Sequence, residues 1–200
     1  MNNAILYLHG KNGSADEAER YQTLCPGYHV IGLDYRGATP WETKAEILAA
    51  YDTLIRQYYR VTVIANSVGA YFAMNALQSE SVSQAFFISP IVDMEKLIRD
   101  MMKWSHVSEA ELEEKRIIET AFGETLSWNY LQYVRDHPII WTAPTRILYG
   151  DRDNLTSIDT VRAFAESCCA DLEIMEGGEH WFHTEKQMAF HDQWIRRYLQ

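Results

Sequence analysis

The feature that most constrains the fold is a regular alternation of two hydrophobic patterns along the chain. Six short apolar runs, rich in Ile, Val, Phe and Tyr, are each followed within three residues by Gly, Pro, Ser or Asp. They span residues 4–8, 28–34, 61–65, 85–89, 145–150 and 171–176. Runs of this length and composition are too short for helices and are typical of buried strands.

Helical patterns lie between these runs. Thr39-Pro40-Trp41-Glu42 is a capping box with proline at the first helical position, and apolar residues follow it at helical spacing as far as Tyr58. A second capping box, Thr184–Gln187, precedes the last helical pattern. Strands that alternate with helices indicate a parallel sheet covered on both sides. We therefore predict an α/β protein, a three-layer α/β/α fold with a mainly parallel sheet of about six strands.

The segment 93–144 interrupts this alternation. It contains no convincing strand, and its helical stretches are EKLIRDMMKW, LEEKRIIETAF after a capping box at Ser108, and WNYLQYV. We predict an all-helical cap insertion over 93–144, with 1–92 and 145–200 forming the core. Its large apolar side chains either pack the insertion onto the sheet or line an apolar pocket over the strand ends. They are Met101, Met102, Trp104, Trp128, Tyr130 and Trp141.

Charge and length exclude several classes of function. The chain of 200 residues carries a formal net charge of −10 and has no run of Lys or Arg, which disfavours nucleic acid and anionic membrane surfaces as partners. No apolar segment approaches the roughly 18 residues of a membrane span, and the N-terminus lacks the basic region of a signal peptide. The three cysteines, Cys25, Cys168 and Cys169, do not form a disulfide framework. We expect reduced thiols in a cytoplasmic protein.

Three residues with complementary chemistry follow three of the predicted strands. Ser67 comes after 61–65, Asp153 after 145–150 and His180 after 171–176. In an open parallel sheet, ligands bind beyond the carboxyl ends of the strands. A serine hydroxyl needs a base to take its proton, histidine has a suitable pKa, and a carboxylate fixes the imidazole tautomer. The order and placement of these residues predict a nucleophilic site.

The stretch VTVIANSVGAYF carries a resemblance to a known family. Ala65-Asn66-Ser67-Val68-Gly69 resembles the G-x-S-x-G nucleophile elbow of the α/β-hydrolase family, whose residues follow the order Ser, acid, His. The resemblance covers nearly the whole chain outside the insertion. The chain departs from the family in having Ala65 in place of glycine and in lacking the leading antiparallel strands. It would be a compact form of the fold.

The resemblance implies a role for each residue. Ser67 would be the nucleophile, His180 the base and Asp153 the acid. The backbone N–H of Val68 and that of Lys11, in the loop after His9-Gly10, would form the oxyanion hole. Asn12 is the less favoured alternative to Lys11.

Alternatives remain open for the acid and the base. Asp151 and Asp93 are the other candidate acids, and His183 is the other candidate base. The remaining histidines and Asp34 suit structural positions. Of these, His191 is expected in the core, His106 and His137 in the cap or on the surface, and His29 at the start of a strand.

These residues favour a serine hydrolase that acts on a small-molecule substrate, a small or medium carboxylic ester. A thioesterase or a peptidase would use the same residues, and a non-catalytic ligand-binding member of the fold is a further alternative. No cofactor is expected, because the chain has neither a dinucleotide fingerprint nor a Walker motif. No metal is expected, because His-x-x-x-His and paired-cysteine spacings are missing.

Overall fold

A computed structural model describes residues 2–199 of the chain. The chain forms two compact units, one made of residues 1–92 and 140–200 and the other of residues 93–139. We call them the core unit and the insert. Residues 140–144, which we predicted within the insertion, belong to the core unit. There the backbone N–H of Ile140 donates to Oε1 of Gln78 at 2.8 Å, and the Trp141 ring contacts the Phe87 ring at a centroid distance of 5.7 Å.

The core unit contains a six-stranded sheet in which every neighbouring pair is parallel, as predicted. The strand order is β2-β1-β3-β4-β7-β8. The strands are β1 (Asn3–Leu8), β2 (Tyr28–Leu33), β3 (Arg60–Asn66), β4 (Gln84–Ile88), β7 (Thr145–Gly150) and β8 (Asp171–Met175). Each corresponds to one of the six apolar runs. Because all the strands are parallel, their carboxyl ends lie at one edge of the sheet.

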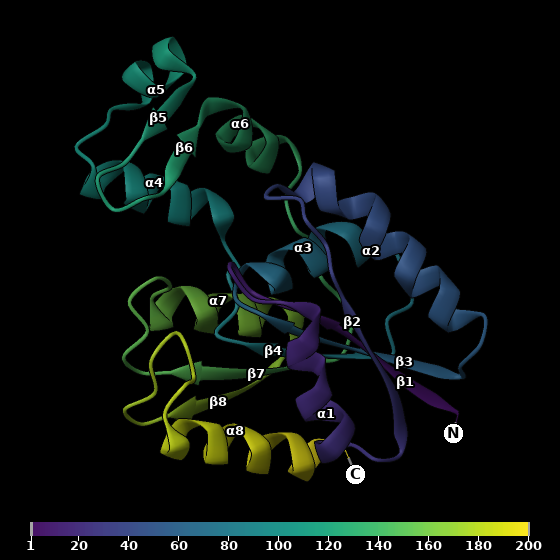
Figure 1. Cartoon of the computed structure of the whole chain (residues 1–200). Helices are drawn as coiled ribbons and strands as arrows, with labels where there is room; N and C mark the ends of the chain where they lie inside the picture. The colour runs from purple at the N-terminus through teal and green to yellow at the C-terminus, as the bar shows by residue number, and fades with distance from the viewer. Residues whose placement is uncertain (1, 200) are drawn as a thin grey trace. The chain divides into compact units, whose positions relative to one another are not determined.

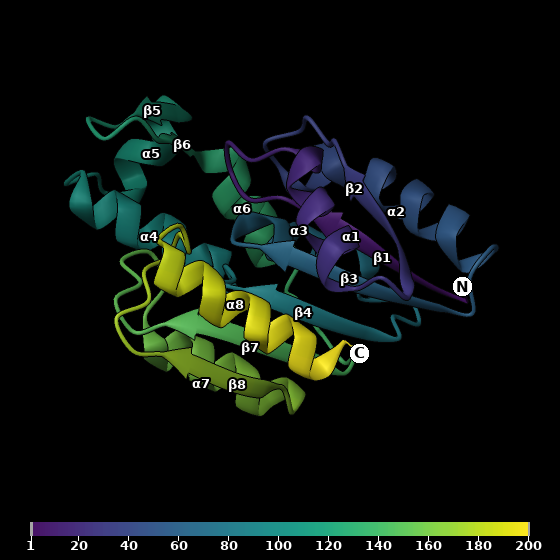
Figure 2. The ribbon, with the colours of Figure 1, turned by 60° about the horizontal axis from the view of Figure 1, so that its bottom comes forward.

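Helices cover both faces of this sheet, which gives the three predicted layers (Figures 1 and 2). One face carries the short 3-10 helix η1 (Ala15–Ala18), α1 (Glu19–Leu24) and α8 (Glu185–Tyr198). The other carries α2 (Pro40–Ile55), α3 (Val68–Leu77) and α7 (Ile158–Cys168). Of the three predicted capping boxes, the two in the core unit are formed: Glu42 accepts from the N–H of Thr39 at 3.1 Å, and Thr184 Oγ1 accepts from the N–H of Gln187 at 3.3 Å. At the third, Ser108 Oγ accepts from the N–H of Glu111 at 3.2 Å.

The inner strands are buried on both faces, which explains their continuous apolar sequence. In β1, residues 4–8 have no exposed surface. On the α1 and α8 face, the ring of Trp194 meets that of Phe86 edge-on, with centroids 5.3 Å apart. Trp194 is 1% exposed, so its replacement by alanine would cost about 3–5 kcal/mol of stability.

The insert is not all-helical, and that prediction was wrong. It consists of α4 (Met94–Trp104), α5 (Glu109–Lys115), β5 (Ile117–Glu119), β6 (Thr125–Ser127) and α6 (Trp128–Asp136). The expected helix over LEEKRIIETAF ends early, because Arg116 has a φ of 64° and two β-branched residues, Ile117 and Ile118, follow it. These residues pair with β6 as an antiparallel hairpin, whose turn contains Gly123 at a φ of 84°.

Arg135 joins three helices of the insert. Its Nε donates to Glu95 of α4 at 2.9 Å, and its two terminal nitrogens donate to Glu109 of α5 at 2.6 and 3.0 Å. The hydrogen bonds that Arg135 donates to Glu109 and Glu95 raise the pKa of its guanidinium above its usual range. Apolar side chains of four elements are buried in the insert: Leu97, Ile98, Met102, Leu112, Leu126, Leu131 and Val134. Trp104 is instead 49% exposed and lies edge-on to Phe122.

All three cysteines are free thiols; Cys25 is buried and Cys169 is exposed. Within residues 2–199, none of the helices combines the length and apolar character needed to cross a membrane.

Candidate active site

Ser67 occupies a strained turn between β3 and α3. Its φ of 51° and ψ of −121° are values that residues other than glycine rarely adopt. Its backbone groups are bonded to the last residue of β4 and to the segment that follows this strand. The Ser67 N–H donates to the Ile88 carbonyl at 3.0 Å, and the Ile91 N–H donates to the Ser67 carbonyl at 3.1 Å. These two bonds hold the strained conformation in place.

The helix that begins after Ser67 lies against the end of β1. A Cβ on Gly69 would stand 2.3 Å from the carbonyl oxygen of His9 and 2.9 Å from that of Leu8, so only glycine fits there. Val68 is the first residue of α3, and its N–H therefore has no acceptor within the helix. The N-terminus of a helix favours a nearby negative charge. An N–H at this position suits an oxyanion.

The structure brings Ser67, His180 and Asp153 into one continuous hydrogen-bonded chain. The distance from Ser67 Oγ to His180 Nε2 is 2.8 Å, and that from His180 Nδ1 to Asp153 Oδ2 is 2.7 Å. The Asp153 side chain has no exposed surface and that of His180 is 14% exposed. Three residues from the ends of β3, β7 and β8 are thus in direct contact.

The carboxylate of Asp153 is bonded through both of its oxygens. Oδ1 accepts from the backbone N–H groups of Leu155 at 2.8 Å and Thr156 at 3.0 Å, which leaves Oδ2 for His180. An ionised carboxylate only accepts hydrogen bonds, so Nδ1 of His180 carries the proton. In the neutral ring, Nε2 is then free to accept the proton of the Ser67 hydroxyl. This is the arrangement that activates a serine.

The alternative acids make other contacts. Asp151 Oδ1 accepts from the N–H of Gly177 at 2.7 Å and ties the loop after β7 to the loop after β8. Asp93 belongs to the insert, where it caps α4 by accepting from the N–H of Lys96 at 2.9 Å. Asp34, which we expected in a structural position and not as the acid, is exposed and lies 3.9 Å from Arg36. Of the three candidate acids, Asp153 is the one in contact with His180.

The other histidines also have structural partners. Nδ1 of His183 bonds the Trp181 carbonyl at 2.7 Å, and its ring stacks on the Trp181 ring. His191 is buried, as expected for a core residue, with Nε2 3.1 Å from the Tyr21 hydroxyl and Nδ1 3.1 Å from Asp192. His29 stacks on Tyr58 of the core unit, and His137 stacks on Tyr133 of the insert. In the insert, His106 has a φ of 55°, and its backbone N–H donates to the Lys103 carbonyl at 3.1 Å.

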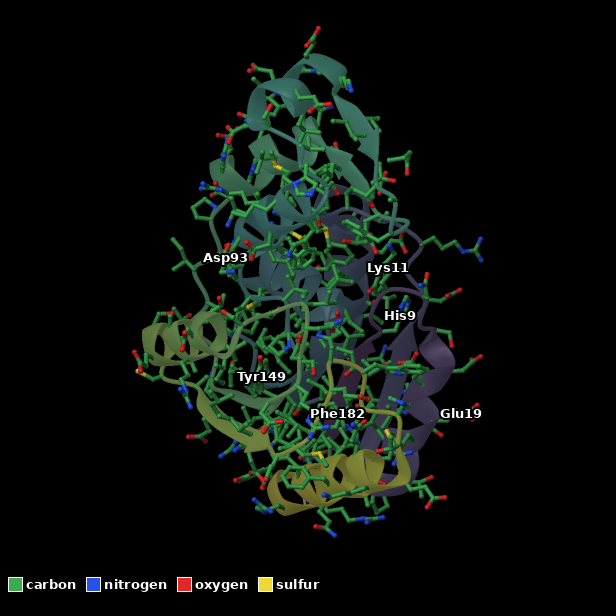
Figure 3. The ribbon with its side chains drawn as sticks, turned by 90° about the vertical axis from the view of Figure 1, so that its left-hand side faces the viewer. His9, Lys11, Glu19, Asp93, Tyr149 and Phe182 are labelled. Atoms are coloured by element: carbon green, nitrogen blue, oxygen red, sulfur yellow. The ribbon has the colours of Figure 1, made fainter. Side chains whose placement is uncertain are left out.

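The loop after β1 is held by an aromatic pair. The His9 ring stacks on the Tyr35 ring at a centroid distance of 4.2 Å, and the Tyr35 hydroxyl donates to the His9 carbonyl. His9 Nδ1 bonds the Gly10 carbonyl at 2.8 Å. Lys11 follows on the same exposed loop (Figure 3). Its part in an oxyanion hole stays a prediction.

Sequence reasoning missed a second chain of hydrogen bonds beside Ser67. The side-chain amide of Asn66 donates to the Tyr7 hydroxyl at 2.8 Å, and that hydroxyl donates to the carboxylate of Glu17. Tyr7 has no exposed surface. A signal was available, because a tyrosine inside a buried strand must find a partner for its hydroxyl.

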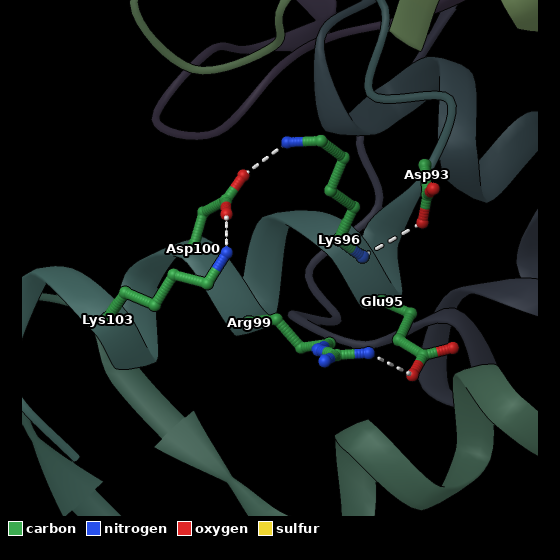
Figure 4. Close-up of a pocket in the computed structure, with 6 residues that line it drawn as sticks. All are labelled: Asp93, Glu95, Lys96, Arg99, Asp100 and Lys103. Carbon is green, nitrogen blue, oxygen red and sulfur yellow. Dashed lines mark hydrogen bonds and ion pairs between the residues drawn. The ribbon is translucent and has the colours of Figure 1, made fainter. Parts of the chain in front are cut away.

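The insert has a pocket of its own, with a volume of about 280 Å³. It is lined along α4 by three acids and three bases: Asp93, Glu95, Lys96, Arg99, Asp100 and Lys103 (Figure 4). Asp100 pairs with Lys96 and Lys103, and Arg99 lies 3.8 Å from Glu95. The charges of the lining therefore compensate one another. Among residues 2–199, no group of three or more His, Cys, Asp or Glu side chains is placed to hold a metal ion.

The sequence matches a family model described as "Uncharacterised protein family (UPF0227)" over residues 4–193. The chain belongs to UPF0227. A search of curated proteins finds no match to this UPF0227 chain.

Solved structures show that this UPF0227 protein has the α/β-hydrolase fold. Est1E from Butyrivibrio proteoclasticus is similar at a TM-score of 0.77 and 18% identity, over 98% of this chain and 86% of Est1E. Alpha/beta hydrolase domain-containing protein 10 from mouse is similar at a TM-score of 0.74 and 15% identity, over 97% and 88% of the two chains. The esterase PF2001 from Pyrococcus furiosus is similar at a TM-score of 0.62 and 20% identity, over 98% of this chain and 80% of PF2001. The predicted resemblance is confirmed at the level of the fold.

Proposed function

We propose that the protein is a serine hydrolase that cleaves small or medium carboxylic esters through an acyl-enzyme on Ser67. One observation carries the proposal: the unbroken chain from Ser67 Oγ to His180 at 2.8 Å and from His180 to Asp153 at 2.7 Å. A serine in this arrangement is an activated nucleophile. The strained backbone of Ser67 supports the same conclusion, since strain of this kind gathers at functional sites.

In the first step, Ser67 Oγ attacks the ester carbonyl carbon while His180 Nε2 takes the hydroxyl proton. The carbonyl oxygen gains the negative charge and is held by backbone N–H groups, those of Val68 and Lys11. The bond to the leaving alcohol then breaks, and the His180 imidazolium gives its proton to the alcohol oxygen. Asp153 stabilises the imidazolium throughout. The products are the free alcohol and an acyl group on Ser67.

In the second step, water takes the place of the alcohol. His180 removes a proton from the water, whose oxygen attacks the acyl carbon and forms a second oxyanion at the same N–H groups. The bond to Ser67 Oγ breaks, and His180 returns the proton to that oxygen. The carboxylic acid leaves and the resting site is restored.

One of the similar structures, PF2001, is named as an esterase. This name supports an ester as the substrate. The substrate class in this proposal therefore rests on the chemistry of the site and on this likeness.

The test combines labelling and turnover. A fluorophosphonate probe should label the wild-type protein at Ser67, as located by peptide mapping, and p-nitrophenyl esters of graded chain length should be hydrolysed. Ser67→Ala should lose both signals, and His180→Ala should lose labelling. Ser157→Ala is the matched control, because this serine caps α7 through a bond to the Thr160 N–H at 3.3 Å. The control should keep full activity.

Three results would change the proposal. Turnover that persists in Ser67→Ala would contradict the proposed mechanism. Labelling of Ser67 together with faster turnover of thioesters or peptides than of esters would keep the mechanism and replace the substrate class. A folded wild-type protein that is neither labelled nor active would instead favour a ligand-binding member of the fold.

A further inference from the structure

We propose that Tyr7 and Glu17 are positioning residues of the site, because they link the turn at Ser67 to the loop that carries Lys11. This inference rests on the proposed function and deepens it. It assigns to two residues outside the Ser–His–Asp chain the task of setting the distance between the two oxyanion donors.

The link is a chain of three hydrogen bonds. Asn66, the residue before Ser67, donates from Nδ2 to the Tyr7 hydroxyl at 2.8 Å. The Tyr7 hydroxyl donates to Oε2 of Glu17. The backbone N–H of Ser14 donates to Oε1 of the same carboxylate at 3.3 Å. One end of the chain is therefore adjacent to Ser67, and the other end lies three residues after Lys11.

Chemistry fixes the direction of each bond. The Nδ2 group of Asn66 can only donate, so the Tyr7 oxygen accepts from it and turns its own proton toward Glu17. Burial raises the pKa of Tyr7 far above its usual value, and the tyrosine stays protonated. The hydroxyl is thus used as donor and acceptor at once, and the geometry at both of its neighbours is constrained.

The loop end of the chain is constrained further by its own turn. The N–H of Gly13 donates to the Gly10 carbonyl at 3.1 Å, and the N–H of Glu17 donates to the Ser14 carbonyl at 3.3 Å. The segment from Gly10 to Ser14 is therefore a folded unit that Glu17 holds from one side. Moving the carboxylate would move the segment on which Lys11 lies.

The position of the segment that carries Lys11 matters because stabilisation of an oxyanion depends steeply on the distance from the N–H donor to the oxygen. Donors act when they lie about 2.7–3.1 Å from the developing charge, and loss of one donor costs about 10²–10³ in kcat. Loosening a donor without removing it should cost less, on the order of tenfold. The loss should appear in kcat rather than in KM, because the oxyanion exists only in the transition state and the intermediates that follow.

The experiment compares Tyr7→Phe with a matched control. Tyr7→Phe keeps the ring and removes the hydroxyl. Tyr51→Phe does the same to a buried tyrosine on α2, whose hydroxyl donates to the Ser81 carbonyl at 2.9 Å. We expect Tyr7→Phe to lower kcat on p-nitrophenyl esters about tenfold with KM within about twofold, while Tyr51→Phe leaves both unchanged.

Two variants of Glu17 keep the inference testable if Tyr7→Phe folds poorly. Glu17 is exposed, so its replacement should be tolerated by the fold. Glu17→Gln keeps one acceptor oxygen and Glu17→Ala keeps none. We expect kcat to fall in the order wild type, Glu17→Gln, Glu17→Ala. Partial rescue by the conservative variant would distinguish positioning from a general loss of stability.

A second readout does not depend on activity. Amide hydrogen exchange in the peptide covering residues 9–18 should become faster in Tyr7→Phe and Glu17→Ala, and should stay unchanged in Tyr51→Phe. If exchange and kcat both match wild type in Tyr7→Phe and Glu17→Ala, the inference is wrong while the proposed function stands. If the wild type neither labels nor turns over, the proposed function fails, and unchanged exchange in Tyr7→Phe would then also overturn the link itself.

Discussion

Gly150 and Gly178 lie so close together that neither position has room for a side chain. A Cβ on Gly150 would stand 2.3 Å from the carbonyl carbon and oxygen of Gly178, and a Cβ on Gly178 would stand 2.8 Å from the Cα of Gly150. Gly150 ends β7 three residues before Asp153, and Gly178 comes two residues before His180. The N–H of Arg152 also donates to the Gly178 carbonyl at 2.8 Å. The contact between the two glycines therefore brings Asp153 toward His180.

Gly150→Ala should damage stability and activity together. The new methyl group must push the two loops apart, which should cost about 1–3 kcal/mol, as overpacking usually does. A displacement of about 1 Å at the His180 to Asp153 bond should lower kcat by up to about 10²-fold. Gly27→Ala is the matched control, because nothing lies within 4 Å of the added Cβ. Thermal melts and ester kinetics on both variants measure the losses of stability and activity. Full activity in Gly150→Ala would contradict the prediction.

Asp153→Asn should preserve the fold and remove most of the activity. The amide can donate a hydrogen bond to His180 Nδ1, and this would move the ring proton to Nε2, where it blocks acceptance from Ser67. We expect kcat to fall about 10⁴-fold. The control is Asp151→Asn, which loses the same charge and keeps an oxygen for the Gly177 N–H. Equal losses in the two variants would show that Asp153 has no special role.

His191 should make stability fall as the pH is lowered. Burial lowers the pKa of His191 below its ordinary value of 6.5 more than Asp192 raises it. The unfolded chain therefore takes up a proton before the folded chain does. The contribution of His191 to the free energy of unfolding is therefore complete above about pH 6.5. Below this pH the contribution falls by at most about 1.4 kcal/mol per pH unit. Melts of His191→Gln between pH 5 and 8 should show a weaker dependence of stability on pH than melts of the wild type. An equal dependence in the two proteins would contradict the prediction.

Arg135→Gln should weaken the insert in particular. The variant loses the bonds to Glu95 and Glu109 that connect α4, α5 and α6. A network of this kind should contribute about 1 kcal/mol, and an isolated exposed pair less. Lys115→Gln removes such a pair, that with Glu111 at 2.8 Å, and serves as the control. Limited proteolysis of the full chain should cut residues 93–139 faster in Arg135→Gln. Equal cutting rates would count against the prediction.

The sheet could be predicted from sequence because four of its six strands, β1, β3, β4 and β7, are inner strands buried on both faces. A continuous apolar run of this length can bury its side chains as an inner strand, and the alternation with capped helices indicates a parallel arrangement. The edge strands β2 and β8 are only partly buried. The insert gave no such signal. Its hairpin has three residues in each strand, and Ile117 and Ile118 continue an apolar spacing that also suits a helix. In the folded protein, pairing with β6 favours the strand over the helix for these residues.

For the site, the sequence could indicate residue types at strand ends but not contacts. Whether Asp153 or Asp151 faces His180 depends on the turn after β7, where two backbone N–H groups orient the Asp153 carboxylate. The catalytic roles of Ser67, His180 and Asp153 stay predictions until they are measured. The link between Tyr7, Glu17 and Asn66 could not be predicted, because its hydrogen bonds join positions far apart in the chain.

The backbone of Ser67 has a consequence for how the protein can evolve. Glycine adopts a φ of 51° and a ψ of −121° without the penalty that serine incurs, on the order of 1–3 kcal/mol. A chain with Ser67→Gly should therefore melt at a higher temperature than the wild type, although it has no nucleophile. Selection for thermal stability alone would replace this serine with glycine, so a serine at this turn supports the role that we propose for Ser67.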